Sequence, residues 1–301
     1  MILKRMLILL LTLMLLPLAA AEETPAPETV APILVDRINS PESNADFAFA
    51  EDAQLFEVFC PQILNCDAFL LRCGGETLLV DCATQGQAAR IIDMCRQLGV
   101  TRIDRVINTH PHADHIGGFR DLIKSVEVGE MWICFPQDYN DHMIKAMGHA
   151  ERAGIPVKTY ADGDTLTLGG ATIDVWKLEG GIAKMNDCSA QFFITYGERT
   201  MLMAADLEGE GQTTYVNLKG EALRADILKY PHHGLEKLRN AYMEAVSPRF
   251  MFVTNNLKEN EGRQYIRTCG VPSGYTVPGI LYLATDGHTW VADRIPSEIK
   301  Y

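Results

Sequence analysis

A stretch of ten residues, 109–118, constrains this chain more than any other part of it. It reads THPHADHIGG and places four side chains of metal-binding type within six positions: His110, His112, Asp114 and His115. Neutral imidazoles and a carboxylate form the ligand set that a borderline-soft divalent cation prefers. The alternative is a loop of solvated histidines, but this concentration of ligand types favours a metal site.

The spacing inside this stretch indicates how the ligands divide. In an extended segment, side chains two positions apart point the same way. His110, His112 and Asp114 are therefore expected to converge on one side of the loop, while His115 turns to the other. One short loop would then serve two metal ions.

The residues around this stretch place it within a fold. The preceding run RVIN, 105–108, is β-prone, and Gly117-Gly118 leads into an expected helix over 119–124. Ligands at the carboxyl end of a strand lie where open sheets place their sites. We therefore expect the metal site at the edge of a sheet.

The hexamer HPHADH is the H-x-H-x-D-H signature, so the chain resembles the metallo-β-lactamase superfamily of dinuclear metal hydrolases. It is more closely similar to the soluble domain of the ComEC competence proteins, from Leu55 to Asp293. The resemblance implies an αββα sandwich, in which two sheets pack face to face with helices outside. Strand clusters that end in a ligand and alternate with helices agree with this four-layer α+β or α/β fold.

Two aspartates after expected strands match further motifs of the superfamily. Asp81, in LLVDCAT, matches a carboxylate that supports the metal loop, although a strand-end aspartate can equally cap a turn. Asp206 matches the carboxylate that bridges both metals, and its alternative is an N-cap for a helix beginning near Glu208. Ala205 precedes it, where ComEC-like chains usually have glycine.

A third motif, PHHG, contains the adjacent histidines His232 and His233. Adjacent side chains diverge, so one is expected to bind metal while the other faces the substrate. The sequence leaves open which histidine has which role. We assign His233 to the metal and take Asp114, His232 and His233 as the catalytic candidates.

The segment 179–206 departs from the superfamily, since it lacks the histidine that many members supply there. Asn186-Asp187-Cys188-Ser189 instead matches the N-[ND]-x-S pattern of the ComEC branch. The resemblance implies that Asp187 or Asn186 offers an oxygen ligand, or that this metal position is weak, with Asn186 and Ser189 supporting the ligands. Oxygen ligands favour manganese or magnesium over zinc.

The implied cofactors are two divalent metal ions, zinc or manganese, and the implied reaction is hydrolysis. Such metals lower the pKa of a bound water, which provides a hydroxide nucleophile, and they stabilise the negative charge that develops. The form with His115 is similar to phosphodiesterase, nuclease and lactonase branches, so a small-molecule or nucleic-acid phosphodiester is the expected substrate. A lactone or other ester hydrolase is the alternative, and a catalytically inactive metal-binding surface module is a third.

The formal net charge of −12 weighs against a nucleic-acid surface, which normally carries a basic stripe. Part of that charge lies in the acidic segment near the N-terminus, and bound divalent cations would add positive charge locally. The charge therefore disfavours a nuclease without excluding one.

The first residues predict export. Lys4-Arg5, the apolar run 6–16 and the small residues Ala19–Ala21 are typical of a signal peptide over 1–21, and hence of a secreted or extracytoplasmic protein. An uncleaved N-terminal anchor is the alternative, although the apolar stretch is shorter than the ~20 residues that usually cross a bilayer. No later run is long and apolar enough to do so.

The next segment, 22–50, is rich in Pro, Glu and Ala and predicts a disordered arm, so 51–301 is expected to form the hydrolase domain. All eight cysteines lie after the arm. In an exported protein, an even number predicts some disulfide pairing, and buried reduced cysteines are the alternative.

Periodicity predicts alternating strands and helices in the domain. The expected strands are 55–59, 68–72, 77–80, 105–108, 131–135, 166–168, 172–176, 191–196, 200–204, 226–230, 250–253 and a final pair around 286–287. The expected helices, besides 119–124, are 85–98, 138–153, 236–246 and 261–269.

Overall fold

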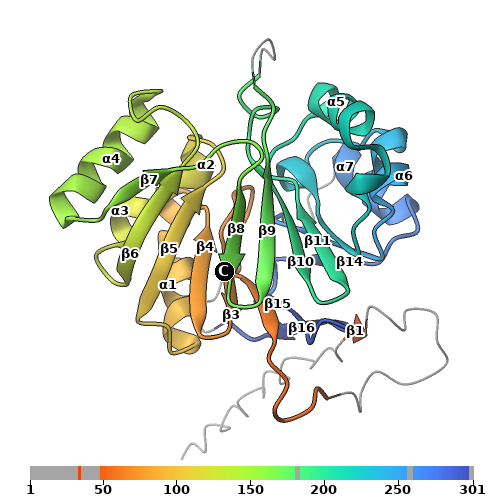
Figure 1. Ribbon diagram of the computed structural model, residues 1–301, viewed down its shortest axis with the longest axis horizontal. Coiled ribbons are helices and arrows are strands. Elements are labelled where there is room, and N and C mark those ends of the chain that lie inside the picture. Colours follow the sequence, from red (N-terminus) through yellow and green to blue (C-terminus); the bar gives the residue numbers. More distant parts are fainter. Residues whose placement is uncertain (1–32, 35–47, 180–183, 256–259, 298–301) are drawn as a thin grey trace, which may run out of the picture. The chain divides into compact units, whose positions relative to one another are not determined.

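Two sheets packed face to face form the centre of the fold (Figure 1). The computed structural model describes residues 33–34, 48–179, 184–255 and 260–297. The larger sheet has nine strands: β1 (Ile33–Leu34), β16 (Trp290–Ile295), β15 (Ile280–Thr285), β2 (Phe56–Cys60), β3 (Phe69–Cys73), β4 (Glu76–Val80), β5 (Arg102–Asn108), β6 (Glu127–Ile133) and β7 (Val157–Thr159). The smaller has seven: β14 (Ser273–Tyr275), β13 (Phe250–Val253), β12 (Ile227–Lys229), β11 (Arg199–Met203), β10 (Gln191–Tyr196), β9 (Ala171–Trp176) and β8 (Thr165–Leu168).

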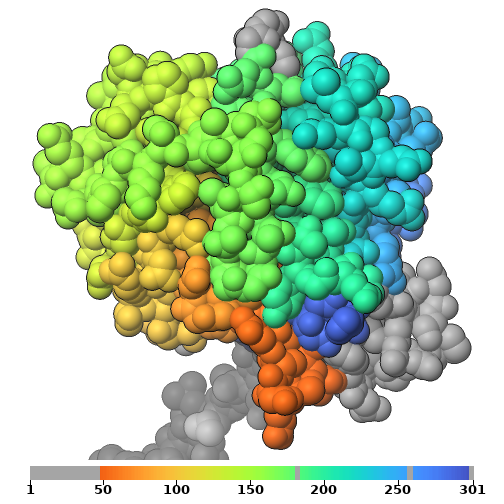
Figure 2. Space-filling view, in the orientation of Figure 1, coloured from red at the N-terminus to blue at the C-terminus, as the bar shows by residue number. Residues whose placement is uncertain are grey.

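Helices cover the outer face of each sheet, which confirms the expected αββα sandwich (Figure 1). Those against the larger sheet are α1 (Ala88–Gln97), α2 (Ala113–Ile116), α3 (Phe119–Leu122) and α4 (Asp141–Ala153). Those against the smaller sheet are α5 (Gly209–Lys219), α6 (Asn240–Val246) and α7 (Glu261–Thr268). In the space-filling view, β8 and β9 lie in green between yellow-green α4 and teal α5 (Figure 2).

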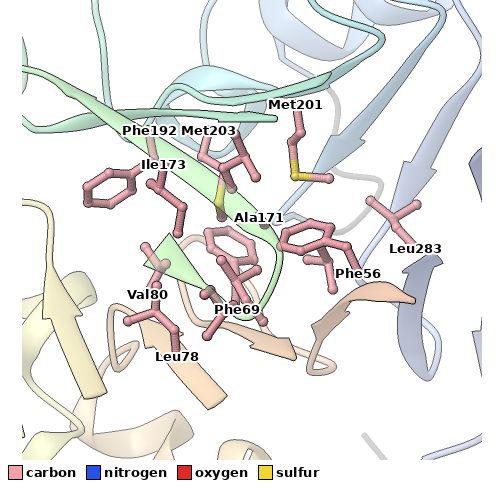
Figure 3. Packing of buried hydrophobic residues seen from close by; sticks show 14 of the residues in the cluster. Phe56, Phe69, Leu78, Val80, Ala171, Ile173, Phe192, Met201, Met203 and Leu283 are labelled. Carbon is pink, nitrogen blue, oxygen red and sulfur yellow. The ribbon is translucent and has the colours of Figure 1, made fainter. Parts of the chain in front are cut away.

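Alternation along the strands produces the layers. In β3, Phe69 and Leu71 point into the core between the sheets, while Leu70 points into the core beneath the helices. Strand side chains alternate in this way, so a strand buried on both faces is apolar throughout. Figure 3 shows the inter-sheet core, where Phe69 of the larger sheet lies opposite Ile173 and Met203 of the smaller.

The direction of the strands places the site residues beyond the carboxyl ends of the parallel strands. Strands β4, β5 and β6 are parallel in the larger sheet, and β11, β12 and β13 are parallel in the smaller. Their carboxyl ends therefore lie together within each sheet, which is where open sheets place their sites. The predicted metal-binding residues all follow strands of these two sets, apart from the segment around Asp187, which precedes β10.

Three short strands are absent from the sequence prediction, and each lies at a sheet edge: β1, β7 and β14. Edge strands bury little surface and so carry a weak apolar signal. Ile33–Leu34 falls in the predicted arm, and it pairs antiparallel with Val291 and Ala292 of β16. The predicted signal peptide and most of the arm lie outside the described residues. Among the helices that the structure describes, none is long and apolar enough to span a membrane.

The predicted disulfide pairing is wrong. All eight cysteines carry free thiols, and five of them are buried: Cys60, Cys66, Cys73, Cys82 and Cys95. Their side chains pack as small apolar groups on both faces of the larger sheet. Burial raises the pKa of the Cys66 thiol to about 12, so it remains protonated and unreactive.

Candidate metal centre

Four segments meet beyond the ends of the parallel strands. The loop that starts with His110 follows β5, and Asp81 directly follows β4. From the smaller sheet, Asp206 comes after β11 and His233 after β12. The fold therefore brings residues more than a hundred positions apart into one cluster.

Two groups of potential metal donors share the Asp206 carboxylate. Within each group, the donor atoms lie within 4.8 Å of one another. The groups are His110, His112 and Asp206, and Asp114, His115, Asp206 and His233. A carboxylate common to both is the arrangement that two neighbouring cations require.

The loop divides its ligands differently from the prediction made from extended spacing. Asp114 lies with His115 and not with His110 and His112. The extended backbone ends at His112, and α2 begins at Ala113. Adjacent residues at the start of a helix do not alternate between two sides as in a strand, so Asp114 and His115 face the same cluster.

Asp206 occupies the centre of the cluster and is only 1% exposed. Its Oδ2 atom lies 3.0 Å from His115 Nε2, 3.4 Å from His233 Nε2 and 3.8 Å from His110 Nε2. Its Oδ1 atom is buried and has no hydrogen-bond partner. A buried carboxylate oxygen without a hydrogen bond is unfavourable, and a cation closer than the Lys229 ammonium, which lies 3.7 Å away, would satisfy it.

Asp81 orients the loop through four hydrogen bonds. Its carboxylate accepts from Thr109 N at 2.8 Å, Thr109 Oγ1 at 2.6 Å and Asn108 Nδ2 at 2.8 Å, and it faces His115 Nδ1 at 2.7 Å. The proton on His115 Nδ1 fixes the ring so that Nε2 points towards Asp206. The side chain thus lies where the sequence predicted a supporting carboxylate.

Thr109 sets the tautomer of His110. Because Thr109 Oγ1 donates to Asp81, it must accept from His110 Nδ1, which lies 3.1 Å away. The lone pair of His110 is then on Nε2, which lies 2.9 Å from His112 Nδ1. Two imidazole nitrogens at this distance can both bind a single cation.

Asp67 orients His233 in the same manner, and sequence reasoning missed it. Its Oδ1 atom faces His233 Nδ1 at 3.0 Å and accepts from Thr254 Oγ1 at 2.8 Å. His233 Nε2 therefore points at the cluster, 3.2 Å from Asp114 Oδ2. The sequence does contain a signal for Asp67, namely a lone acidic residue directly before an apolar strand. A charge expected to be buried needs a partner, and this requirement could have pointed to a role at the site.

Lys229 is the second residue that sequence reasoning missed. This fully buried lysine ion-pairs with Asp67, donates to the Ala205 carbonyl at 2.7 Å and lies 3.7 Å from Asp206 Oδ1. Ala205 has a φ of 38°, a left-handed conformation that costs a residue with a side chain free energy. Its carbonyl also accepts from His232 N at 3.0 Å, so two donors hold the turn that aims Asp206.

The segment after β9 supports the cluster from one side. Ser189 Oγ donates to the Asn186 carbonyl at 2.6 Å and accepts from Asp206 N at 3.4 Å, while Asn186 Nδ2 donates to Glu208 at 2.7 Å. Asp187, predicted as a metal ligand, lies outside both donor groups. Its Oδ1 accepts instead from Glu208 N at 2.8 Å and from the Gly211 backbone, so it caps the start of α5.

The two histidines of the PHHG motif separate as the sequence predicted. His233 is buried in the cluster, whereas the His232 side chain is 22% exposed and lies outside both donor groups. Its Nδ1 atom is 3.9 Å from carboxylate oxygens of both Glu208 and Glu236. Both histidines have positive φ, 48° and 54°, and their ring centroids lie 5.9 Å apart in an edge-on arrangement.

Electrostatics divide the imidazoles into two kinds. Burial lowers the pKa of His110 well below its usual range, and the adjacent His115 lowers it further. Burial also opposes charge on His115 and His233, but the surrounding aspartates outweigh it and raise both pKa values well above the usual range. Burial disfavours ionised Asp114 as well, yet its hydrogen bond with His233 and the charge of His115 hold its pKa at about 2.

These residues fit a pair of divalent cations. Imidazole nitrogens and carboxylate oxygens suit zinc or manganese, and the cluster is a buried, acidic pocket with an unsatisfied oxygen on Asp206. Each ring of His110, His115 and His233 has an outer partner on its other nitrogen, as metal-bound histidines generally do. Among the described residues, the group with His110 and His112 holds three donors and the other holds four.

The fold and the donor groups define a class, namely αββα proteins with a candidate metal site built from His and Asp side chains. The family model described as the Metallo-beta-lactamase superfamily matches residues 62–243, more than half of the chain. The chain therefore belongs to the metallo-β-lactamase superfamily, whose members are metal-dependent hydrolases.

Curated relatives cover several activities. The chain is 29% identical over 139 residues to ComE operon protein 3 of Bacillus subtilis, spanning 45% of this chain and 18% of that protein. It is 36% identical over 105 residues to a hydroxyacylglutathione hydrolase of Synechococcus, spanning 34% of each, and 31% identical over 121 residues to ribonuclease Z of Bradyrhizobium diazoefficiens, spanning 36% of this chain and 38% of that protein. The matches thus span well under half the length of each relative.

Proposed function

We propose that this protein is a metal-dependent phosphodiesterase of the ComEC-like type, with zinc or manganese as its cofactor. The observation that carries the proposal is the pair of donor groups that share Asp206. Divalent cations bound by these residues would supply an activated water and would stabilise the charge that develops on a phosphoryl oxygen. The protein side chains around the cations would determine how the substrate is positioned.

The residues divide this work among themselves. The residues that would hold the cations are His110, His112, Asp114, His115, Asp206 and His233. Most of them are buried, while the Asp114 side chain is 32% exposed and leaves the site open on that side. Asp81 and Asp67 fix two of the rings by accepting their Nδ1 protons. His232 is partly exposed and lies outside the two donor groups that share Asp206, so we assign it to proton transfer with the substrate.

Two features agree with a phosphodiester substrate. His115 completes a four-donor group, the form of the motif that resembles phosphodiesterase and nuclease branches, and lactonase branches as well. One curated relative is named ribonuclease Z and another is named ComE operon protein 3. The relative named hydroxyacylglutathione hydrolase favours an ester or thioester substrate as the second candidate.

The decisive experiment is hydrolysis by the purified protein, with manganese, with zinc and with chelator. The substrates are end-labelled single-stranded DNA, a dinucleoside phosphate, a lactone and a thioester. Asp206→Asn keeps the size of the side chain and removes the shared charge, while Glu151→Gln alters an exposed carboxylate on α4 and serves as the matched control. We expect metal-dependent cleavage of a phosphodiester that Asp206→Asn abolishes and Glu151→Gln leaves intact.

Other outcomes assign the alternatives. Turnover of the lactone or thioester alone would replace the phosphodiesterase with an ester hydrolase of the same fold. Stoichiometric metal binding without turnover of any substrate would indicate the inactive metal-binding module.

We also propose that the protein acts outside the cytoplasm. Support comes from Lys4-Arg5, the apolar run 6–16 and the small residues before Glu22. N-terminal sequencing of protein recovered from the medium or periplasm of an expressing bacterium should begin at Glu22. Recovery of intact protein only from the cytoplasm would contradict this assignment, and recovery from membranes with Met1 present would indicate an anchor.

A further inference from the structure

The described part of the chain contains a groove of about 350 Å³. Its walls come from the segment after β6 and from the segments on either side of residues 180–183. They include Phe135, Tyr139, Lys177, Glu179, Lys184 and Met185. The volume falls at the small end of the range for ligand pockets, roughly 300–1,000 Å³.

One wall of the groove is joined directly to the metal loop. Cys134, which lines the groove, donates through Sγ to the Thr109 carbonyl at 3.3 Å. Asn140, next to Tyr139, donates to the Pro111 carbonyl at 2.9 Å, between the two histidines of the first donor group. A ligand that contacts Cys134 or Tyr139 is therefore separated from the metal loop by a single side chain.

The opposite wall is joined to the segment that follows Asp206. Met185 and Cys188, which line the groove, flank the Asn186 that hydrogen-bonds to Glu208. Lys184, also in the lining, ion-pairs with the same Glu208. Both sides of the groove are therefore joined to segments of the metal centre, one by hydrogen bonds to the metal loop and the other by an ion pair to Glu208.

The lining selects for the chemistry of its occupant. Phe135 and Tyr139 contact each other with ring centroids 4.9 Å apart, and Tyr139 is 47% exposed, which leaves an aromatic surface free. Lys177 Nζ lies 4.9 Å from the centre of the Phe135 ring and 3.4 Å from Glu179 Oε1. The groove therefore combines a stacking surface with a positive and a negative hydrogen-bonding group.

Two classes of occupant fit this lining poorly. A purely apolar group would remove water from the Lys177–Glu179 ion pair and offer it no hydrogen bond in exchange, which is unfavourable. A highly anionic group would meet Glu179 in a protein whose formal net charge is −12. A flat, neutral heteroaromatic ring can stack on Tyr139 and use the charged groups along its edge.

We propose that this groove binds one unpaired nucleobase of the substrate, next to the phosphodiester that is cleaved. The inference rests on the proposed phosphodiesterase function and adds its substrate class, single-stranded nucleic acid or a nucleotide. A paired base has its hydrogen-bonding edge occupied, whereas an unpaired base offers both a face and an edge. This recognition needs no basic stripe, which agrees with the acidic composition.

The test begins without metal, so that base binding is measured apart from hydrolysis. Adenosine and ribose 5-phosphate are titrated in EDTA by ligand-observed NMR. Adenosine should bind and ribose 5-phosphate should not. Stacking on one aromatic side chain typically accounts for about 1–3 kcal/mol per base, so Tyr139→Ala should weaken adenosine binding by about 5- to 150-fold. Lys177→Met, which keeps much of the apolar stem, should also weaken it.

The matched control is Ile144→Ala. Ile144 is another exposed apolar residue of this region, 51% exposed on α4, but it does not line the groove. It should bind adenosine as the unchanged protein does. Binding of both probes with equal strength, or unchanged adenosine binding in Tyr139→Ala and Lys177→Met, would overturn the inference.

A second arm separates this inference from the proposed function. With manganese present, cleavage of a dinucleoside phosphate is compared with cleavage of its abasic analogue. The preference for the base-containing substrate should fall about tenfold in Tyr139→Ala. Adenosine binding without any hydrolysis would contradict the phosphodiesterase and support the base groove, while equal hydrolysis of both substrates would support the phosphodiesterase and contradict the groove.

Discussion

The Lys229 ammonium connects two carboxylates of the metal centre, since it ion-pairs with Asp67 and lies 3.7 Å from Asp206 Oδ1. All three side chains are almost completely buried. Burial raises the pKa of Asp67, but Lys229 and His233 outweigh this effect and keep the pKa below its usual range. The lysine therefore compensates part of the negative charge that the site carries before any cation binds.

Replacing Lys229 with methionine should destabilise the metal-free protein strongly. The change leaves the Asp67 carboxylate buried without its cation, and breaking a buried pair in this way costs about 3–5 kcal/mol. Urea unfolding in chelator measures the loss. The double variant Lys229→Met, Asp67→Asn removes both charges and should recover part of it.

A surface pair provides the control for this prediction. Lys158 ion-pairs with Glu130 at 2.6 Å, and its side chain is 55% exposed. Lys158→Met should cost less than about 1 kcal/mol, because exposed pairs contribute little. Equal losses for the two lysines would show that Lys229 does not stabilise the buried carboxylate.

The strands of both sheets could be predicted from the sequence because many of them are apolar runs separated by turns that contain glycine. The strand Phe250–Val253 was predicted with its observed bounds, and β10 likewise. Helix starts were less accurate, since the segments before α4 and α6 are irregular until Asp141 and Asn240. Helix ends are set by local capping that composition describes only loosely.

The site was predicted where ligands stand close together in the chain. His110 to His115 could be read directly, but their division between two donor groups depends on where α2 begins. Asp67 and Lys229 were missed because their roles exist only after β3 and β12 are brought together from the two sheets. Asp187 resembles a ligand in sequence, yet its position directs it to the backbone of α5.

Asp81→Asn should lower metal affinity by about 10- to 100-fold, the usual effect of removing an outer partner of a metal-bound histidine. An amide cannot accept all four hydrogen bonds that Asp81 receives, and it leaves the His115 ring unfixed. Competition with a chromophoric chelator measures the change. Asp104→Asn is the matched control, because Asp104 accepts from Thr77 N and Oγ1 near the start of β5, away from the cluster.

The metal content of Asp104→Asn should match that of the unchanged protein. If both aspartate variants lost affinity equally, the effect would be general destabilisation and not the orientation of His115.

His232→Ala and His233→Ala should have different effects, although the residues are adjacent. His233 belongs to the four-donor group, so His233→Ala should lose metal and activity together. His232 lies outside both groups, so His232→Ala should keep the metal and lose turnover. Metal content by elemental analysis, measured beside the rate, separates these outcomes. Equal metal loss in both variants would contradict the division of roles.

Metal affinity at the two donor groups should depend differently on pH. His115 and His233 have raised pKa values, so in the metal-free protein they hold protons at neutral pH that a cation must displace. Affinity at their group should rise with pH, by up to about tenfold per pH unit for each proton displaced, and level off above their folded pKa values. His110 and His112 have lowered pKa values, so their group should change little above pH 6.5.

The same pKa shifts make the stability of the metal-free protein fall as the pH rises, whereas metal affinity rises. Groups with raised pKa values stabilise the folded state below their unfolded pKa, and this contribution is lost as the pH rises through the folded values. Zinc or manganese titrations between pH 6 and 9, with proton release followed by calorimetry in buffers of different ionisation enthalpy, measure the binding side. A His115→Ala variant should flatten the steep phase, whereas His112→Ala should leave it. A single shallow dependence shared by both binding events would contradict the protonated state of His115 and His233.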